Sequence, residues 1–215
     1  MATKERPLRA DARDNRERIL AAAREVFVEQ GPGAPLEDVS RRAGTGIATL
    51  YRRFPDRQAL IRAVALDALR RTTEEVLRAR DEEPTAFAAL VRYMHRVLDI
   101  RIGAVFPVLL NEIPFDDEEI AAVRDEGVAI MRELVTTAQE DGDLRPDVTH
   151  ADVGMMLVRL SRPMPGPMPP ETGAELAHRH LELVVDGLRA GRPSELGGPA
   201  LTFDDLRSMR DEPAT

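Results

Sequence analysis

The stretch from Gly44 to Arg57 limits the possible folds of this chain more than any other segment. It reads Gly-Thr-Gly-Ile-Ala-Thr-Leu-Tyr-Arg-Arg-Phe-Pro-Asp-Arg, which places a glycine turn, a short helix and a proline break close together. A second short helix is predicted just before it, over residues 36–43. Two short helices joined by a glycine-containing turn are typical of a helix-turn-helix, whose second helix enters the DNA major groove. The segment therefore predicts a helical head that binds duplex DNA.

Helical periodicity continues through the rest of the sequence, and no segment shows the alternation of a strand. We therefore expect an all-α fold with an N-terminal three-helix head at 1–60, a helical-bundle body at 61–190 and a loosely ordered tail at 191–215. Residues 1–13 are expected to form a disordered arm, and the prolines of 163–170 an extended connector. The predicted helices cover residues 16–30, 36–43, 47–54, 56–80, 82–102, 105–111, 114–139, 149–162 and 172–190.

Composition excludes several classes of protein. The chain has no cysteine, so disulfides, thiolate metal sites and cysteine nucleophiles are ruled out. No run of about 18 apolar residues is present, which excludes a transmembrane helix. The first fifteen residues are charged and lack the apolar core of a secretion signal. These features favour a cytoplasmic protein without a membrane partner.

The charge is divided unevenly between the two ends of the chain. Residues 1–62 carry 13 Lys and Arg against 9 Asp and Glu, whereas residues 63–215 carry 17 against 29. An acidic protein can bind DNA when its positive charge is gathered on the binding surface. The division is consistent with a basic head and an acidic body, although chance unevenness remains an alternative.

The second short helix has one apolar face and one polar face. Ile47, Leu50 and Phe54 recur at helical spacing and are expected to point inward. The remaining positions combine small side chains, a tyrosine hydroxyl and two arginines. Arginine can bind guanine through two hydrogen bonds, which contributes about 1–3 kcal/mol of discrimination between bases.

The run from Ala43 to Leu60, together with 19–27 and Gly31, resembles the signature of the tetracycline-repressor (TetR/AcrR) family. The resemblance implies a homodimeric repressor that binds operator DNA and releases it when a small-molecule effector binds the body. Three positions depart from the family pattern. Pro35 replaces a common hydroxyl residue, Gly46 replaces a common capping serine, and Ile47 stands where a polar residue is common. The DNA contacts that the resemblance implies are Glu37, Ala48, Thr49, Tyr51, Arg52, Arg53 and Arg57.

The helical body contains a set of residues that combine apolar lining with a few polar groups, as ligand sites require. Core packing is the favoured alternative for each methionine in this set, and a structural role is the favoured alternative for the histidine. The effector candidates are Tyr93, Met94, His95, Arg101, Phe106, Asn111, Met131, Met155 and Arg159.

The last two predicted helices carry apolar stripes that could form the homodimer seam, as a four-helix bundle of two copies. The same stripes could serve an internal core, and the family resemblance favours the seam. The candidate dimer residues are Val153, Met156, Leu157, Leu160, Leu176, Leu183, Val184 and Leu188.

No catalytic constellation is evident, so we expect neither an enzyme nor a cofactor. His178 and His180 lie two positions apart and fall on different faces of their helix, which argues against a metal site there. A helical ligand-binding or protein-interaction module without DNA recognition remains the alternative function. Salt-dependent binding to duplex DNA distinguishes the two.

Overall fold

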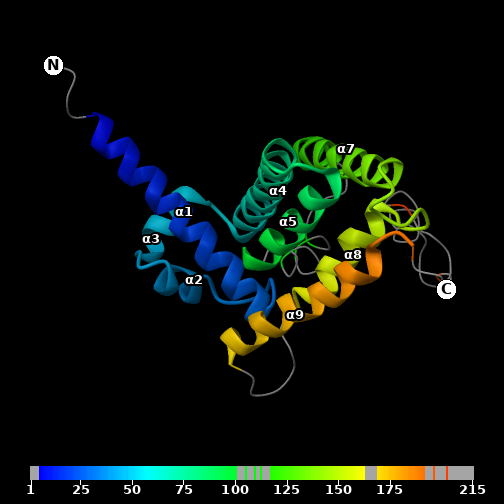
Figure 1. Cartoon of the computed structure of the whole chain (residues 1–215). Coiled ribbons are helices and arrows are strands. Elements are labelled where there is room, and N and C mark those ends of the chain that lie inside the picture. Colours follow the sequence, from blue (N-terminus) through cyan, green and yellow to red (C-terminus); the bar gives the residue numbers. More distant parts are fainter. Residues whose placement is uncertain are drawn as a thin grey trace, which may run out of the picture. The chain divides into compact units, whose positions relative to one another are not determined.

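The computed structural model describes residues 5–100, 105, 109, 112, 117–162, 169–191, 196 and 202, and for residues 5–13 and Pro170 it describes the backbone alone. The fold is all-α, as expected from the sequence (Figure 1). None of the described helices combines the length and the apolar character that a membrane span needs. The helices are α1 (Glu5–Gln30), α2 (Leu36–Arg42), α3 (Ile47–Arg53), α4 (Arg57–Glu82), α5 (Ala86–Asp99), α7 (Glu118–Glu140), α8 (His150–Leu160) and α9 (Pro170–Leu188).

The chain divides into two compact units. Unit 1 comprises residues 1–70 and 105–121, and unit 2 comprises residues 71–104 and 122–215. Unit 1 contains α1, α2, α3 and the first half of α4. Its core is formed by apolar side chains at helical spacing, because one face of each helix is removed from water. The largest fully buried side chains of this unit are Ile19, Leu20, Phe27, Leu50, Leu60, Ile61 and Leu109.

An ion-pair network in unit 1 joins α4 to the start of α7. Arg62 donates from Nη2 to Asp117 over 2.9 Å and to Glu119 over 2.8 Å, and Arg70 donates to Glu119 over 2.6 Å. The hydrogen bonds from Arg62 lower the pKa of the Asp117 carboxyl and that of Glu119. Asp117 also accepts from the backbone N–H of Ile120 and so caps α7.

Unit 2 is built around α5, α8 and α9, with the second half of α4 and most of α7. Thr85 caps α5 by accepting from the N–H of Ala88. Thr149 and Asp152 form a reciprocal capping box at the start of α8. The buried core of this unit includes Val76, Phe87, Leu90, Met94, Met131, Leu134, Leu144, Val153, Leu157, Leu181 and Leu188.

Two expectations about segments outside the predicted helices differ from the structure. Residues 5–13, expected to be a disordered arm, continue α1 as a helix, since adding a residue to an existing helix costs far less than nucleating one. Pro170, expected in an extended connector, is the first residue of α9, where a proline loses no helical hydrogen bond. The expected helix at 105–111 falls outside the described residues except for Val105 and Leu109, which are both buried.

Candidate DNA-binding surface of the helix-turn-helix

The turn between α2 and α3 depends on a glycine in the left-handed region. Gly44 has a φ of 62°, a conformation that residues with a Cβ atom seldom adopt. The turn is closed by the N–H of Thr45, which donates to the carbonyl of Ser40 over 2.9 Å. The carbonyl of Gly46 then accepts from the N–H of Thr49 and begins α3. Backbone geometry alone starts α3, because Gly46 offers no side-chain cap.

The inner face of α3 anchors it to unit 1. Leu50 and Phe54 are buried as predicted, whereas Ile47 is only half-buried. Phe54 follows the last residue of α3, and the guanidinium of Arg16 on α1 lies 6.0 Å from the centre of its ring. An arginine at this distance from an aromatic face is attracted by the ring quadrupole. The anchors fix which side of α3 faces outward.

The outer face of α3 presents the predicted contact residues to solvent. Ala48, Tyr51, Arg52 and Arg53 are exposed, and Tyr51 retains 47% of its accessible surface. Arg52 donates from Nη2 to the Thr49 hydroxyl over 3.0 Å, one turn earlier on the helix. This hydrogen bond holds the guanidinium against the helix face and restricts its orientation.

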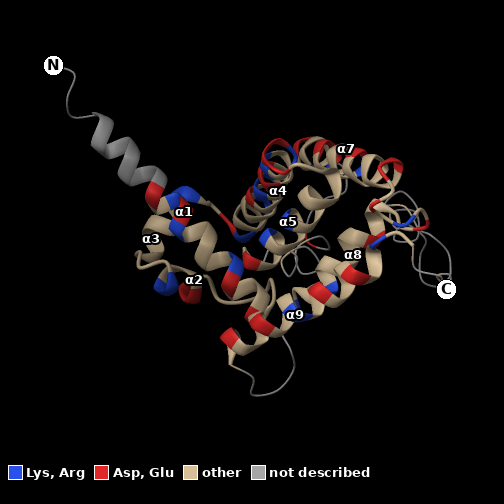
Figure 2. Ribbon diagram, in the orientation of Figure 1, with Lys and Arg blue, Asp and Glu red and all other residues tan. Residues whose placement is uncertain are grey.

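The arginines of α3 differ electrostatically from those of α2. Arg41 is paired with Asp38, and Arg42 lies 2.8 Å from Glu29 and 3.6 Å from Glu25 of α1. The hydrogen bond that Arg42 donates to Glu29 raises the pKa of Arg42. Within the described part of the chain, no carboxylate lies within ion-pair distance of Arg52 or Arg53. Both signs of charge occur on α2 and on the coloured part of α1 (Figure 2), whereas the two charged residues of α3, Arg52 and Arg53, are both basic.

Glu37 and Arg57 are positioned differently from the residues of α3. Glu37 is exposed in the first turn of α2, where an acidic side chain complements the helix dipole. Arg57 is half-buried, and its Nη1 donates to the carbonyl oxygens of Pro32 and Ala34. The guanidinium therefore links the start of α4 to the loop between α1 and α2.

The predicted effector residues that the structure describes lie in unit 2 and have different environments. Met94 and Met131 are buried in the core, and Tyr93 packs against it. Burial raises the pKa of the Tyr93 hydroxyl to about 12, so that it stays protonated at neutral pH. Met155 and Arg159 are exposed on α8. Arg101, Phe106 and Asn111 lie outside the described residues.

The predicted dimer residues fall into three groups. Val153, Leu157 and Leu188 are buried in the core of unit 2, where they pack within their own chain. Leu183 is 65% exposed, the largest fraction among these apolar residues. A third environment lies between these extremes, and its members are the half-buried Met156, Leu160, Leu176 and Val184.

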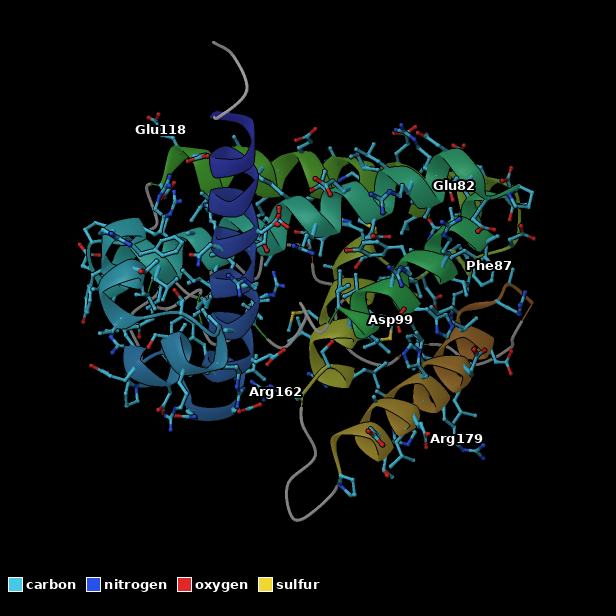
Figure 3. All side chains as sticks on the ribbon, turned by 90° about the vertical axis from the view of Figure 1, so that its left-hand side faces the viewer. Glu82, Phe87, Asp99, Glu118, Arg162 and Arg179 are labelled. Carbon is cyan, nitrogen blue, oxygen red and sulfur yellow. The ribbon has the colours of Figure 1, made fainter. Side chains whose placement is uncertain are left out.

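One polar cluster in unit 2 was missed by sequence reasoning. His95 on α5 lies against His178 on α9, and each ring also lies beside a carboxylate, Glu182 and Asp99 respectively. Figure 3 labels Asp99 at the end of α5. The two histidines are 83 positions apart, and no local pattern of residues predicts such a pairing.

Comparison with known proteins places these features in a family. Residues 19–64 match the model described as bacterial regulatory proteins, tetR family. Residues 85–190 match the C-terminal domain model of SbtR-like transcriptional regulators. The regulator UidR of Escherichia coli is 28% identical over 164 residues, which cover 72% of this chain and 81% of UidR.

Solved structures agree with the family models. The TetR transcriptional regulator SCO0520 from Streptomyces coelicolor is 30% identical, with a TM-score of 0.58, over 82% of this chain and 99% of that one. LfrR from Mycobacterium smegmatis, solved in complex with proflavine, is 25% identical, with a TM-score of 0.59, over 80% of this chain and 96% of that one. Since the helix-turn-helix and the helical body are both matched, this chain belongs to the TetR family of DNA-binding transcriptional regulators.

Proposed function

We propose that the chain is a ligand-responsive repressor that binds a pseudo-palindromic operator through the outer face of α3. The observation that supports this most strongly is the exposed pair Arg52 and Arg53, which have no acidic partner within the described residues. Thr49 orients Arg52, and Ala48 is small enough for close approach to a thymine methyl group. Tyr51, Arg53, Glu37 and Arg57 complete the proposed contact set.

Selection of duplexes from a random pool tests this proposal. The wild-type protein is expected to select an inverted repeat whose half-sites lie about one helical turn of DNA, or a multiple of it, apart. Arg52→Ala is expected to change the base preference at one position in each half-site. Arg132→Ala, an exposed arginine of α7, serves as the matched control and is expected to leave the motif unchanged. An unchanged motif in Arg52→Ala contradicts the assignment of Arg52 to base reading.

Salt dependence separates this function from that of a module without DNA recognition. Each phosphate contact that arginine makes releases counterions, so the logarithm of the binding constant falls by about 0.9 per contact for each unit of log salt. A steep slope supports operator binding. Failure of the protein to bind any duplex at low salt contradicts the proposal.

A homodimer is proposed through the outer face of α8 and α9. Five apolar side chains support this face, since they remain partly or largely exposed: Met156, Leu160, Leu176, Leu183 and Val184. The buried Val153, Leu157 and Leu188 then support the face from within the core. Isologous contact between two copies generates the two-fold symmetry that an inverted repeat requires.

Sedimentation of Leu183→Arg tests the dimer. Leu183 is sufficiently exposed for this change to leave the core intact, and a charge in an apolar interface is costly. We expect the wild type to sediment as a dimer and Leu183→Arg as a monomer with an unchanged circular dichroism spectrum. Arg179→Glu changes the charge at an exposed position on the same helix. This control tests whether any change of charge on α9 is enough to dissociate the dimer. A dimeric Leu183→Arg variant excludes this face.

We further propose that unit 2 binds a small-molecule effector in the cytoplasm. The complex of LfrR with proflavine supports this expectation for a relative. The hydroxyl of the partly buried Tyr93 would offer a hydrogen-bond donor beside the apolar Met94 and Met131. An effector shifts the operator equilibrium only through different affinities for the free and DNA-bound forms. A compound that raises the melting temperature and weakens operator binding, with both effects reduced in Tyr93→Phe, would identify the site.

A further inference from the structure

His95 and His178 face each other edge to edge where α5 and α9 of the same chain pack together. The two Nδ1 atoms are 2.9 Å apart, the ring centres 5.2 Å apart, and the ring planes differ by 4°. The distance between the ring centres exceeds the distance between the Nδ1 atoms by about twice the radius of an imidazole ring. Both Nδ1 atoms therefore lie on the line that joins the two ring centres. The rings are therefore nearly coplanar and are not stacked face to face.

The outer nitrogens of the same rings face carboxylates. Nε2 of His95 lies 3.1 Å from Oε1 of Glu182, and Nε2 of His178 lies 3.0 Å from Oδ1 of Asp99. Asp99 also accepts a hydrogen bond from Nη1 of Arg96. Nε of Arg96 lies 3.5 Å from Oε2 of Glu75 on α4. Since a carboxylate only accepts hydrogen bonds, each Nε2 carries its proton.

Proton counting then defines the state of the two inner nitrogens. With both Nε2 atoms protonated, a hydrogen bond between the two Nδ1 atoms requires one donor and one acceptor. A metal ion held by both Nδ1 atoms takes the place of the proton in that hydrogen bond.

We propose that His95 and His178 form a binding site for a divalent transition-metal ion, with Nδ1 of each ring as a ligand. Metal-binding histidines almost always donate their other N–H to a carboxylate or carbonyl, which fixes the tautomer. Glu182 and Asp99 already occupy this supporting position. Imidazole nitrogen suits Zn²⁺, Cu²⁺ and Ni²⁺ rather than Mg²⁺ or Ca²⁺. His178 pairs here with His95 on another helix, and not with His180, which lies two positions further along α9.

To hold the ion, the two rings must move apart and tilt. Two nitrogens bound tetrahedrally to zinc at about 2.0–2.1 Å are about 3.3–3.4 Å apart, slightly wider than the present 2.9 Å. The rings must also tilt so that both lone pairs point at the ion. Glu182 and Asp99 can follow this motion, since their side chains are 66% and 41% exposed. No group of three or more ligating side chains is gathered among the described residues, so water would complete the coordination.

Titration of the metal-free full-length protein with zinc chloride tests the proposal by calorimetry. We expect saturable binding of one zinc ion per chain, because each chain holds one such pair of histidine nitrogens. His95→Gln and His178→Gln are expected to lose this binding. His180→Gln changes an exposed histidine on the same helix, which has no polar partner among the described residues. It is the matched control and is expected to keep the binding.

The carboxylates supply a second readout if a histidine variant fails to fold. Glu182→Gln and Asp99→Asn leave both proposed ligands in place, and each is expected to weaken zinc binding about 10- to 100-fold. Zinc should also raise the melting temperature of the wild type, because it binds only the folded pair. No saturable binding in the micromolar range, or equal binding by the wild type and both histidine variants, overturns the proposal. Neither result bears on operator binding, which is measured separately.

Discussion

Arg57 and Ala34 are joined by a hydrogen bond of 2.6 Å, in which the guanidinium Nη1 donates to the carbonyl oxygen. The same nitrogen lies 2.8 Å from the carbonyl oxygen of Pro32. The side chain thus holds the loop that precedes α2 against the start of α4. It restrains the backbone just before α2, whose N-cap residue, Pro35, offers no side-chain hydrogen bond. A bracing role and a phosphate-binding role for Arg57 make different predictions.

Arg57→Met removes both the brace and the charge. If bracing dominates, the free energy of unfolding falls by about 1.5–3 kcal/mol, the usual contribution of hydrogen bonds from a charged group. Operator affinity also falls, but the salt slope stays at the wild-type value. Arg53→Ala, by contrast, is expected to reduce the slope by about one phosphate contact. A reduced slope in Arg57→Met shows that Arg57 binds phosphate, and full rescue by Arg57→Lys points to the same conclusion.

Thr49→Val removes the hydroxyl that accepts from Arg52 while keeping the branched shape of the side chain. Arg52 then samples more orientations, and discrimination at the base it reads is expected to fall by about 1 kcal/mol, the typical net contribution of one hydrogen bond. Competition binding with single-base operator variants measures this loss. Thr49→Ser retains the acceptor and should restore discrimination. Equal discrimination by Thr49→Val and the wild type shows that the hydrogen bond does not guide recognition.

The Arg62–Asp117 pair is expected to make stability depend on acid pH. Arg62 lowers the pKa of Asp117 below its ordinary value of 3.8, so the folded protein holds the charged form more strongly than the unfolded chain does. This stabilisation is complete above about pH 4 and is lost as the pH falls through the folded-state pKa. Urea unfolding between pH 7 and pH 3 should show the decline. Asp117→Asn and Arg62→Met should each reduce it, and the double variant should reduce it by less than their sum.

Gly127 on α7 approaches Thr73 on α4 within unit 2. A Cβ atom at Gly127 would lie 2.8 Å from the hydroxyl oxygen of Thr73, which is buried and branched at Cβ. Gly127→Ala is therefore expected to destabilise the protein by about 1–3 kcal/mol through overpacking. Gly187→Ala on α9 meets no atom within 4 Å and should stabilise by up to about 1 kcal/mol through helix propensity.

Thr73→Ala provides the test of that explanation. Adding it to Gly127→Ala removes the clashing oxygen and should recover most of the lost stability in urea unfolding. If the double variant is no more stable than Gly127→Ala alone, the contact with Thr73 is not the cause.

The helix-turn-helix could be predicted closely because its determinants are local. Gly44 supplies the one positive φ that the turn needs, Leu50 and Phe54 lie on the inner face, and Asp56 accepts from the N–H of Ala59 to cap α4. Each of these interactions joins residues within a few positions of one another. The α1 boundary was missed because Glu5 and the residues after it continue a helix that the core already nucleates.

The amphipathic stripes of α8 and α9 illustrate what a pattern leaves open. Periodicity identifies the apolar face of a helix but not the surface that covers it. Val153 and Leu188 prove to be core residues of unit 2, while Leu183, on the same helix as Leu188, is largely exposed. Only the packing of α5, α8 and α9 separates these roles.

The sequence by itself determined the helical class, the position of α3 and its exposed arginines, because hydrophobic spacing and turn chemistry act over a few residues. Tertiary structure alone decided that Arg57 would brace the loop before α2, and that His95 would meet His178 between two carboxylates. These contacts join residues far apart in the chain. They depend on how the helices pack against one another. Burial of the whole core determines this packing, and no local pattern of residues encodes it.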